Sequence, residues 1–172
     1  MKLKEINHFI TEIYGLKHII RYNNIPKITN ESVAEHTFFV TAIVLKLNNY
    51  YKFNLEKALV MATIHDFIET YISDIPRNVK NKYKKLNDVL IEVEKDAWND
   101  IYPEYKIYID ELEENKTIEA KIVNLADTLS VLQYSSTETK LGNEGYMKQV
   151  FIDINKKINK NIENINKMGC NK

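Results

Sequence analysis

The sequence predicts an all-α protein with a single domain. Its apolar residues recur every three or four positions, which is helical spacing and not the alternation of β-strands. Only four glycines and three prolines interrupt 172 residues, and 44% of them are hydrophobic, enough for one buried core. No repeat or Gly-, Pro- or Ser-rich linker divides the chain. We therefore expect one domain over residues 1–172, with a helical core at 1–165 and a frayed tail at 166–172.

The first two helices are predicted on either side of an irregular segment. Lys4–Ile20 carries one apolar stripe, and residues 22–31, with Pro26, follow as a loop. Ser32 and Glu35 have the spacing of a capping box, in which each side chain bonds to the backbone amide of the other. This pattern starts the second helix and places His36 in its first turn, on or beside the buried face.

The third helix is predicted over Leu55–Thr70, and its apolar stripe ends in the acidic residues Asp66 and Glu69. Pro76 suits the first turn of a new helix, which continues as a lysine-rich segment to about Ile101. Pro103 separates that segment from a short acidic stretch over residues 104–115.

Ile118–Tyr134 is predicted to be the central helix, because apolar residues cover most of its circumference. Asp127 lies within it, and no cation is one turn away in the sequence. A buried ionised carboxylate costs several kcal/mol without a counter-charge or a metal, so we expect a partner from elsewhere in the fold. Gly142 supplies a C-cap, and a last amphipathic helix of roughly 20 residues follows, giving about six to seven helices in all.

Two histidines and two carboxylates on three predicted helices form a candidate metal site: His36, His65, Asp66 and Asp127. Mixed nitrogen and oxygen ligands suit Mn²⁺, Co²⁺, Fe²⁺, Zn²⁺ or Mg²⁺, and the residues alone do not choose among these ions. Glu69 lies one helical turn beyond His65 and Asp66, so it projects to the same region. It is a candidate proton donor or acceptor.

The composition favours a small-molecule substrate. The chain has 24 basic and 24 acidic residues, so no broad cationic field is available to bind nucleic acid. No stretch approaches the apolar length of a membrane span. A single cysteine, Cys170, excludes an intramolecular disulfide, and the N-terminus lacks the pattern of a secretory signal. We expect a cytoplasmic protein with no membrane and no nucleic-acid partner.

The candidate residues resemble the H…HD…D pattern of the HD-domain phosphohydrolases, an all-helical superfamily of metal-dependent phosphoesterases. The resemblance extends to the bacterial 5′-deoxynucleotidases of this superfamily, in five ordered motifs. The motifs are Arg21-Tyr22 for their Arg-Trp, Val33-Ala34-Glu35-His36 for V-x-E-H, His65-Asp66-Phe67-Ile68-Glu69 for H-D-x-x-E, Asp74-Ile75-Pro76 for D-L-P, and Ala126-Asp127 for A-D.

This resemblance implies an HD-type helical bundle and a role for each matched residue. It implies that one divalent metal is held by His36, His65, Asp66 and Asp127, and that Glu69 and Arg21 are catalytic. The substrate-binding residues implied are Arg21, Tyr22, Asp74, Ile75, Pro76 and Arg77. It also implies a homo-oligomer, with a dimer favoured. Two positions depart from the pattern, because Tyr22 replaces Trp and Arg77 stands where the family often has a small polar residue.

The predicted function is a metal-dependent phosphohydrolase that releases phosphate from deoxyribonucleoside 5′-monophosphates through attack by a metal-bound water. The alternative is a deoxynucleoside triphosphohydrolase of the dATP-degrading type, for which Arg77, Lys80 and Lys82 could supply extra cations. A third hypothesis is a metal-containing helical sensor or scaffold without turnover. Glu69 and Arg21 argue against it, because a structural metal site needs neither.

Overall fold

The computed structural model describes residues 3–170, and within that range the chain folds into helices joined by turns and loops, which confirms the all-α prediction. Its α-helices are α1 (Leu3–Tyr14), α2 (Val33–Leu47), α3 (Leu55–Ile64), α4 (Glu69–Ile72), α5 (Arg77–Lys82), α6 (Lys84–Ile101), α7 (Lys106–Glu114), α8 (Ile118–Lys140) and α9 (Tyr146–Asn166). Two 3₁₀ helices, η1 (Gly15–Lys17) and η2 (Pro103–Tyr105), are added to these. The end of the expected tail, residues 171–172, lies outside the described residues.

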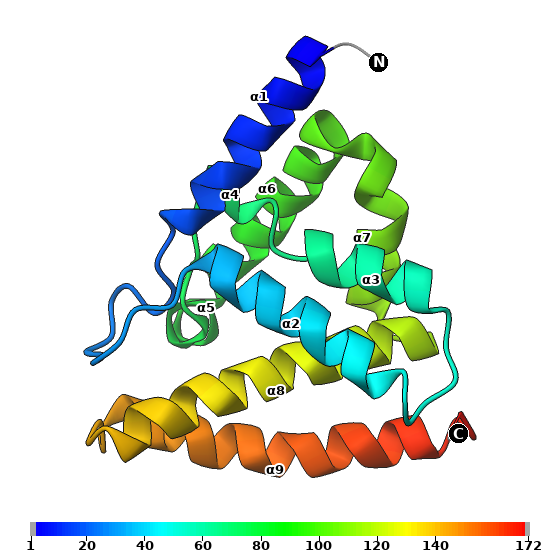
Figure 1. The fold of residues 1–172 in the computed structure, drawn as a ribbon. Helices are drawn as coiled ribbons and strands as arrows, with labels where there is room; N and C mark the ends of the chain where they lie inside the picture. Colours follow the sequence, from blue (N-terminus) through cyan, green and yellow to red (C-terminus); the bar gives the residue numbers. More distant parts are fainter. Residues whose placement is uncertain (1–2, 171–172) are drawn as a thin grey trace.

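Helix α8 is the centre of the bundle, as its apolar circumference predicts. It lies antiparallel beside α9, and α2 and α3 pack on it (Figure 1). The core between these helices is built from fully buried side chains such as Val44 of α2, Met61 of α3 and Leu125 of α8. Each such side chain contributes roughly 1.5–3 kcal/mol through burial, so the helices that carry the candidate site are fixed by this core.

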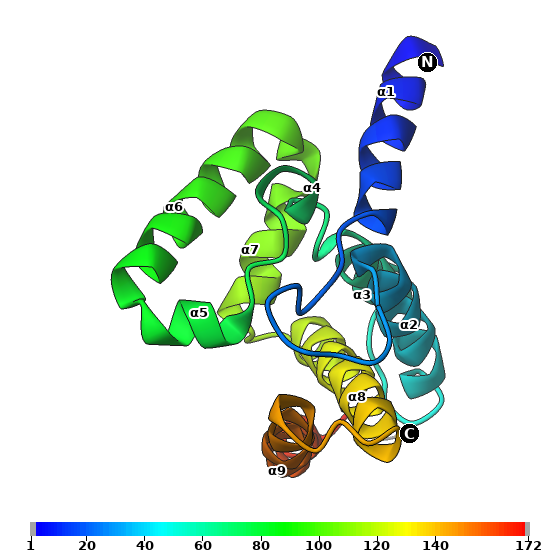
Figure 2. The ribbon, with the colours of Figure 1, turned by 90° about the vertical axis from the view of Figure 1, so that its left-hand side faces the viewer.

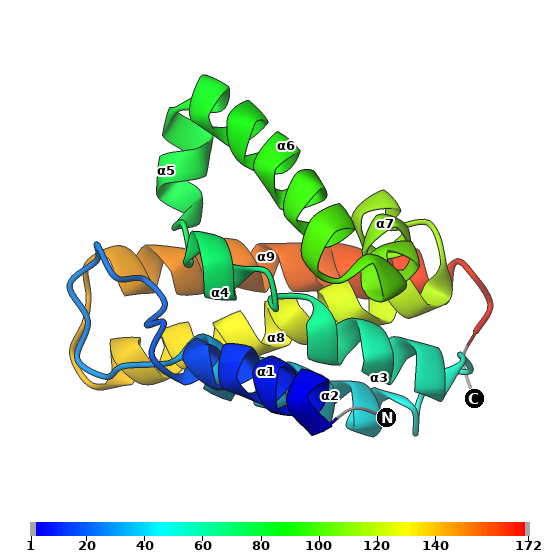
Figure 3. The same cartoon turned by 90° about the horizontal axis from the view of Figure 1, so that it is seen from above.

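Helices α5 and α6 stand away from the α8–α9 pair as an arm (Figures 2 and 3). A second core holds the base of this arm, where Trp98 and Tyr102 pack with Phe67 and Leu16. The rings of Phe67 and Tyr102 meet edge to face with centroids 6.1 Å apart, a favourable aromatic geometry. Because Phe67 directly follows the His65-Asp66 pair, this core also fixes the candidate site.

Two predicted helices are each broken in the structure. The predicted Leu55–Thr70 helix stops at Ile64, because the His65 ring donates through Nδ1 to the carbonyl of Ala62 at 2.8 Å. That carbonyl is the acceptor that the next α-helical turn would use. The lysine-rich helix breaks at Tyr83, whose φ of −118° and ψ of 80° are not helical. These breaks and the helical folding of residues 106–114 produce more helices than the sequence predicts.

Other boundaries follow the predicted signals more closely. The first helix ends at Tyr14, earlier than expected, and continues as the 3₁₀ turn η1, in which Gly15 approaches Thr70 closely. The capping box at Ser32 and Glu35 is confirmed. Gly142 has a φ of 103°, which confirms the predicted C-cap of α8. No helix among residues 3–170 is long and apolar enough to cross a membrane.

Candidate active site

Two buried imidazole rings lie side by side at the centre of the candidate site. His36, in the first turn of α2, is fully buried, and its ring centroid is 5.4 Å from that of His65. Each ring is held through Nδ1: that of His36 lies 3.1 Å from Oγ of Ser130, and that of His65 bonds to the Ala62 carbonyl. Both Nε2 atoms are buried without a hydrogen-bond partner. Rings oriented in this way present their other nitrogen as a metal ligand.

Two carboxylates face these nitrogens. Asp127 of α8 has Oδ1 at 3.2 Å from Nε2 of His36, and Asp66 has Oδ2 at 3.1 Å from Nε2 of His65 and 3.7 Å from that of His36. Donor atoms of His36, His65 and Asp127 all lie within 4.8 Å of one another. Ligands at about 2.0–2.2 Å from one cation are separated by distances of this order. The donor set of His36, His65 and Asp127 therefore fits a divalent cation, and Asp66, the fourth predicted ligand, lies beside this group without belonging to it.

The protonation states of these groups suit a cation. Burial alone would raise the pKa of Asp66, but His65 and His36 outweigh it and lower that pKa to about 2. Burial likewise opposes ionisation of Asp127, yet the neighbouring His36 ring and the charge of Arg21 hold its pKa below the usual range. Burial, and then Arg21, lower the pKa of His36. Burial opposes protonation of His65, but the charge of Asp66 outweighs burial and raises the pKa of His65. The site thus combines ionised carboxylates with one imidazole, His36, that favours its neutral form and one, His65, that must release its proton to bind a cation.

Glu69 begins α4 and lines the same cavity as His65 and Asp66. Its Oε2 atom is buried and has no hydrogen-bond partner. Burial, followed by repulsion from Asp66 and Asp74, raises the pKa of Glu69 to about 10. The carboxyl group is therefore protonated at neutral pH, and it can donate a proton within the cavity.

Arg21 is paired with a carboxylate that the sequence did not single out. Its Nη1 lies 3.1 Å from Oε2 of Glu31, and its backbone amide donates to the Glu31 carbonyl at 2.9 Å. An isolated antiparallel bridge between Ile20 and Ser32 closes the loop of residues 22–31 beside this pair. The charges of Tyr22, Asp66 and Asp127 raise the pKa of Arg21 against the effect of burial, so the guanidinium stays charged.

Tyr22 connects the loop to the turn before α5. Its φ of 54° is left-handed, a strained conformation for a non-glycine residue. In this conformation its backbone amide donates to Oδ2 of Asp74 at 3.1 Å. The two segments predicted to bind substrate are thus joined directly by a hydrogen bond.

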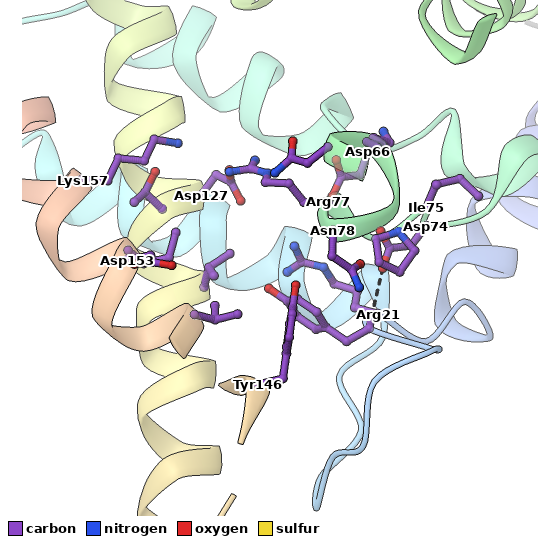
Figure 4. A pocket seen from close by; sticks show the side chains of 18 of the residues that line it. Arg21, Asp66, Asp74, Ile75, Arg77, Asn78, Asp127, Tyr146, Asp153 and Lys157 are labelled. Atoms are coloured by element: carbon purple, nitrogen blue, oxygen red, sulfur yellow. Dashed lines mark hydrogen bonds between the residues drawn. The ribbon is translucent and has the colours of Figure 1, made fainter. Parts of the chain in front are cut away.

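A cavity of about 530 Å³ brings most of the predicted site residues together (Figure 4). They are Arg21, Tyr22, His65, Asp66, Glu69, Asp74, Ile75, Pro76, Arg77 and Asp127, while His36 lies buried behind them. Of the lysines considered for the triphosphate alternative, Lys80 lines the cavity but pairs with Glu94 at 3.2 Å, and Lys82 is not among the lining residues.

The sequence reasoning missed the wall contributed by α9. Tyr146, Val150, Asp153 and Lys157 line the cavity and share one face of that helix. Their helical spacing was visible in the sequence, but nothing there indicates that this face meets Asp127. Figure 4 shows Lys157 and Asp153 on the same side of the cavity as Asp127.

Comparison with known proteins decides the family. The family model of YfbR-like 5′-deoxynucleotidases matches residues 8–171. The chain belongs to this family. A 5′-deoxynucleotidase of Erwinia tasmaniensis is 28% identical over 158 residues, which cover 82% of this chain and 78% of that protein.

Solved structures agree with the assignment to the YfbR-like family. A protein of Pyrococcus horikoshii superposes with a TM-score of 0.78 at 26% identity, over 95% of this chain and 98% of that one. An HD-domain phosphohydrolase of Listeria innocua gives 0.75 at 26% identity, over 92% of this chain and 82% of that one. The predicted resemblance is confirmed, and the chain is a 5′-deoxynucleotidase-like HD phosphohydrolase.

Proposed function

We propose that this hydrolase releases phosphate from deoxyribonucleoside 5′-monophosphates, with one divalent cation held by His36, His65, Asp66 and Asp127. One observation carries the proposal: two buried imidazole nitrogens without partners face two carboxylates, beside a charged guanidinium and a protonated glutamic acid. The bound cation would neutralise phosphate charge and make a water acidic enough to attack phosphorus. Two imidazole ligands favour Mn²⁺, Fe²⁺, Co²⁺ or Zn²⁺ over Mg²⁺, which prefers oxygen ligands.

Arg21 is the proposed phosphate ligand in this reaction. Its side chain is 13% exposed, and its ion pair with Glu31 involves Nη1. The ion pair holds the planar guanidinium in one orientation, and the other N–H groups of the guanidinium can donate hydrogen bonds to phosphate oxygens. Glu31 therefore acts as a positioning residue for Arg21.

Glu69 is the proposed general acid. As water attacks phosphorus, the bond from phosphorus to the 5′-oxygen breaks, and that oxygen needs a proton to leave as a hydroxyl. Burial raises the pKa of Glu69 and so favours the protonated carboxyl group that this step requires. The sequence left open whether Glu69 is an acid or a base, and its burial supports the acid.

The sugar is proposed to lie against Tyr22 and the turn from Asp74 to Arg77, which line the cavity beside Arg21. Preference for a deoxy sugar requires close packing where a 2′-hydroxyl would sit, because a site that merely lacks a partner for it discriminates weakly. The hydrogen bond between Tyr22 and Asp74 supports this proposal, since it holds the two walls at a fixed separation.

The experiment that tests this function is a substrate panel with Mn²⁺, Co²⁺ or Mg²⁺. The five deoxynucleoside monophosphates are compared with AMP and dATP, and the products are identified. We expect inorganic phosphate from the deoxy monophosphates and little turnover of AMP. Triphosphate released from dATP alone would support the triphosphohydrolase instead, and no turnover with tight metal retention would support the sensor. The cytoplasmic location and the homodimer both stay predictions. Size-exclusion chromatography with light scattering would test the dimeric state.

A further inference from the structure

Two cations of the cavity have no partner in the mechanism proposed above. Arg77 is the first residue of α5, and Lys157 lies in the fourth turn of α9 facing the cavity. In Figure 4 both side chains extend into the cavity from different walls, on the side of Asp127 and across from Arg21. From the sequence, Arg77 was an implied substrate-binding residue and an extra cation for the triphosphohydrolase alternative, and nothing there pointed to Lys157.

Neither cation is neutralised by the protein. Among residues 3–170, the side chains of Arg77 and Lys157 make no hydrogen bond and no ion pair within 4.0 Å, although the charge of Asp127 acts on Lys157. The acids nearby on α8 and α9 are engaged, because Asp127 lies 3.2 Å from His36 and Asp153 accepts a hydrogen bond from Gln149 at 3.0 Å. Burial and the charge of Arg77 lower the pKa of Lys157, as expected for two like charges held near one another.

The charges of the other site groups indicate whether Arg77 and Lys157 can compensate the negative charge of a bound phosphate. A divalent cation balances the ionised Asp66 and Asp127, and the ion pair of Arg21 with Glu31 is neutral overall. Burial favours the neutral form of the Glu69 carboxyl group. A phosphate monoester brings two further negative charges into the cavity, which Arg77 and Lys157 line as solvent-exposed residues. Arg77 and Lys157 bring two positive charges to this cavity, whose lining also includes the carboxylates of Asp74 and Asp153, hydrogen-bonded to the Tyr22 amide and to Gln149.

We propose that Arg77 and Lys157 form a second cationic wall, which binds the phosphate group of the substrate opposite Arg21 and selects for a phosphate with two negative charges. The inference rests on the proposed function, because it assigns the phosphate to the same cavity. It also excludes phosphodiesters, which carry one negative charge, as preferred substrates.

The test is the binding of inorganic phosphate to the Mn²⁺-loaded protein, measured by isothermal titration calorimetry in wild type, R77Q, K157Q and K157R. K156Q is the matched control, because Lys156 is exposed on the same helix and does not line the cavity. We expect R77Q and K157Q each to weaken phosphate binding about tenfold, K157R to retain most of it, and K156Q to match wild type.

A second measurement separates phosphate contact from a structural role. Mn²⁺ binding to the metal-free protein should be unchanged or tighter in R77Q and K157Q, because each removes a positive charge that repels the metal ion. A merely structural role would weaken Mn²⁺ and phosphate binding together and lower the Tm. The two affinities are therefore expected to move independently or in opposite directions.

Three results would overturn the proposal. They are phosphate binding that is absent in wild type or unchanged in both variants, a parallel loss of metal and phosphate affinity, and a loss confined to dATP that leaves inorganic phosphate unaffected. The last result would assign the wall to additional phosphate groups. None of these measurements needs turnover, so a protein that binds phosphate as expected but hydrolyses no deoxynucleotide would refute the proposed function and not this inference.

Discussion

The ring of Tyr22 lies stacked on the ring of Tyr134, with centroids 5.5 Å apart and planes 7° from parallel. The hydroxyl of Tyr134 also donates to the carbonyl of Thr29 at 2.7 Å. One side chain of α8 thus holds both ends of the loop that carries Arg21 and Tyr22. These contacts fix the loop on α8, the central helix of the bundle.

Replacing Tyr134 with Ala should raise KM for dAMP about tenfold and change kcat less, because the stacked ring positions Tyr22 beside the proposed sugar site. Aromatic pairs of this geometry contribute about 0.5–1.5 kcal/mol beyond the area they bury, and the lost burial adds to this. Tyr134→Phe keeps the ring and removes only the hydroxyl, so it should show a smaller change in KM. Steady-state kinetics of both variants check the prediction, and equal KM values in the two would contradict it.

Glu138 anchors the same loop through a fully buried carboxylate. Its oxygens accept from the amides of Ile28 and Thr29 at 2.8 and 2.7 Å, and from Asn143 Nδ2 at 2.9 Å. Glu138→Gln puts an amide donor against these donors, and we expect it to lower the free energy of unfolding by about 2–4 kcal/mol at pH 7. Urea denaturation measures this change in stability. Glu144→Gln is the control, because Glu144 is exposed in the turn that follows α8.

The stability from Glu138 should also depend on pH. Burial opposes its ionisation, but hydrogen bonds from Thr29, Ile28 and Asn143 outweigh burial and lower its pKa. A lowered pKa in the folded state gives stability that is present above the unfolded value of about 4.5 and is lost as pH falls through the folded pKa. The advantage of wild type over Glu138→Gln should therefore shrink below about pH 4.5. A stability difference that is constant from pH 7 to pH 3 would contradict this.

The metal site was predictable from the sequence to the extent that its residues are close in the chain or lie on strongly periodic helices. His65, Asp66 and Glu69 were grouped by local spacing, and they line one cavity although the helix breaks between them. Asp127 was selected because a carboxylate on an apolar helix needs a partner.

The residues missed by the sequence reasoning depend on contacts between distant segments. Glu31 reaches Arg21 only because the backbone bridge between Ile20 and Ser32 closes the loop. Lys157 reaches the cavity only because α9 packs antiparallel to α8. Polar residues at such positions look the same in a sequence as residues of a solvated helix face, so no local pattern distinguishes them.

Binding of Mn²⁺ should stabilise the protein, because the cation binds the folded donor set and not the unfolded chain. At a concentration of 100 times Kd the stabilisation is about 2.7 kcal/mol, which for a domain of this size raises the Tm by several degrees. His65→Ala should abolish the shift and the hydrolysis of dAMP, whereas His18→Ala, exposed outside the cavity, should keep both. Differential scanning calorimetry with and without EDTA checks this, and an undiminished metal shift in His65→Ala would remove that residue from the ligand set.

Replacing Glu69 with Gln tests the proton transfer most directly, because Gln has nearly the shape of a protonated glutamic acid but cannot release a proton. The Oε2 atom of Glu69 is buried, and an uncharged side chain at this position is not repelled by Asp66 and Asp74. The neutral amide should therefore leave the fold and the Mn²⁺ affinity unchanged. We expect kcat for dAMP to fall by about 10²–10⁴ with little change in KM. A substrate whose leaving group needs no proton, such as a nitrophenyl phosphate, should be hydrolysed by Glu69→Gln with a much smaller loss. An equal loss of kcat for both substrates would show that Glu69 orients the water or the phosphate and does not protonate the leaving oxygen.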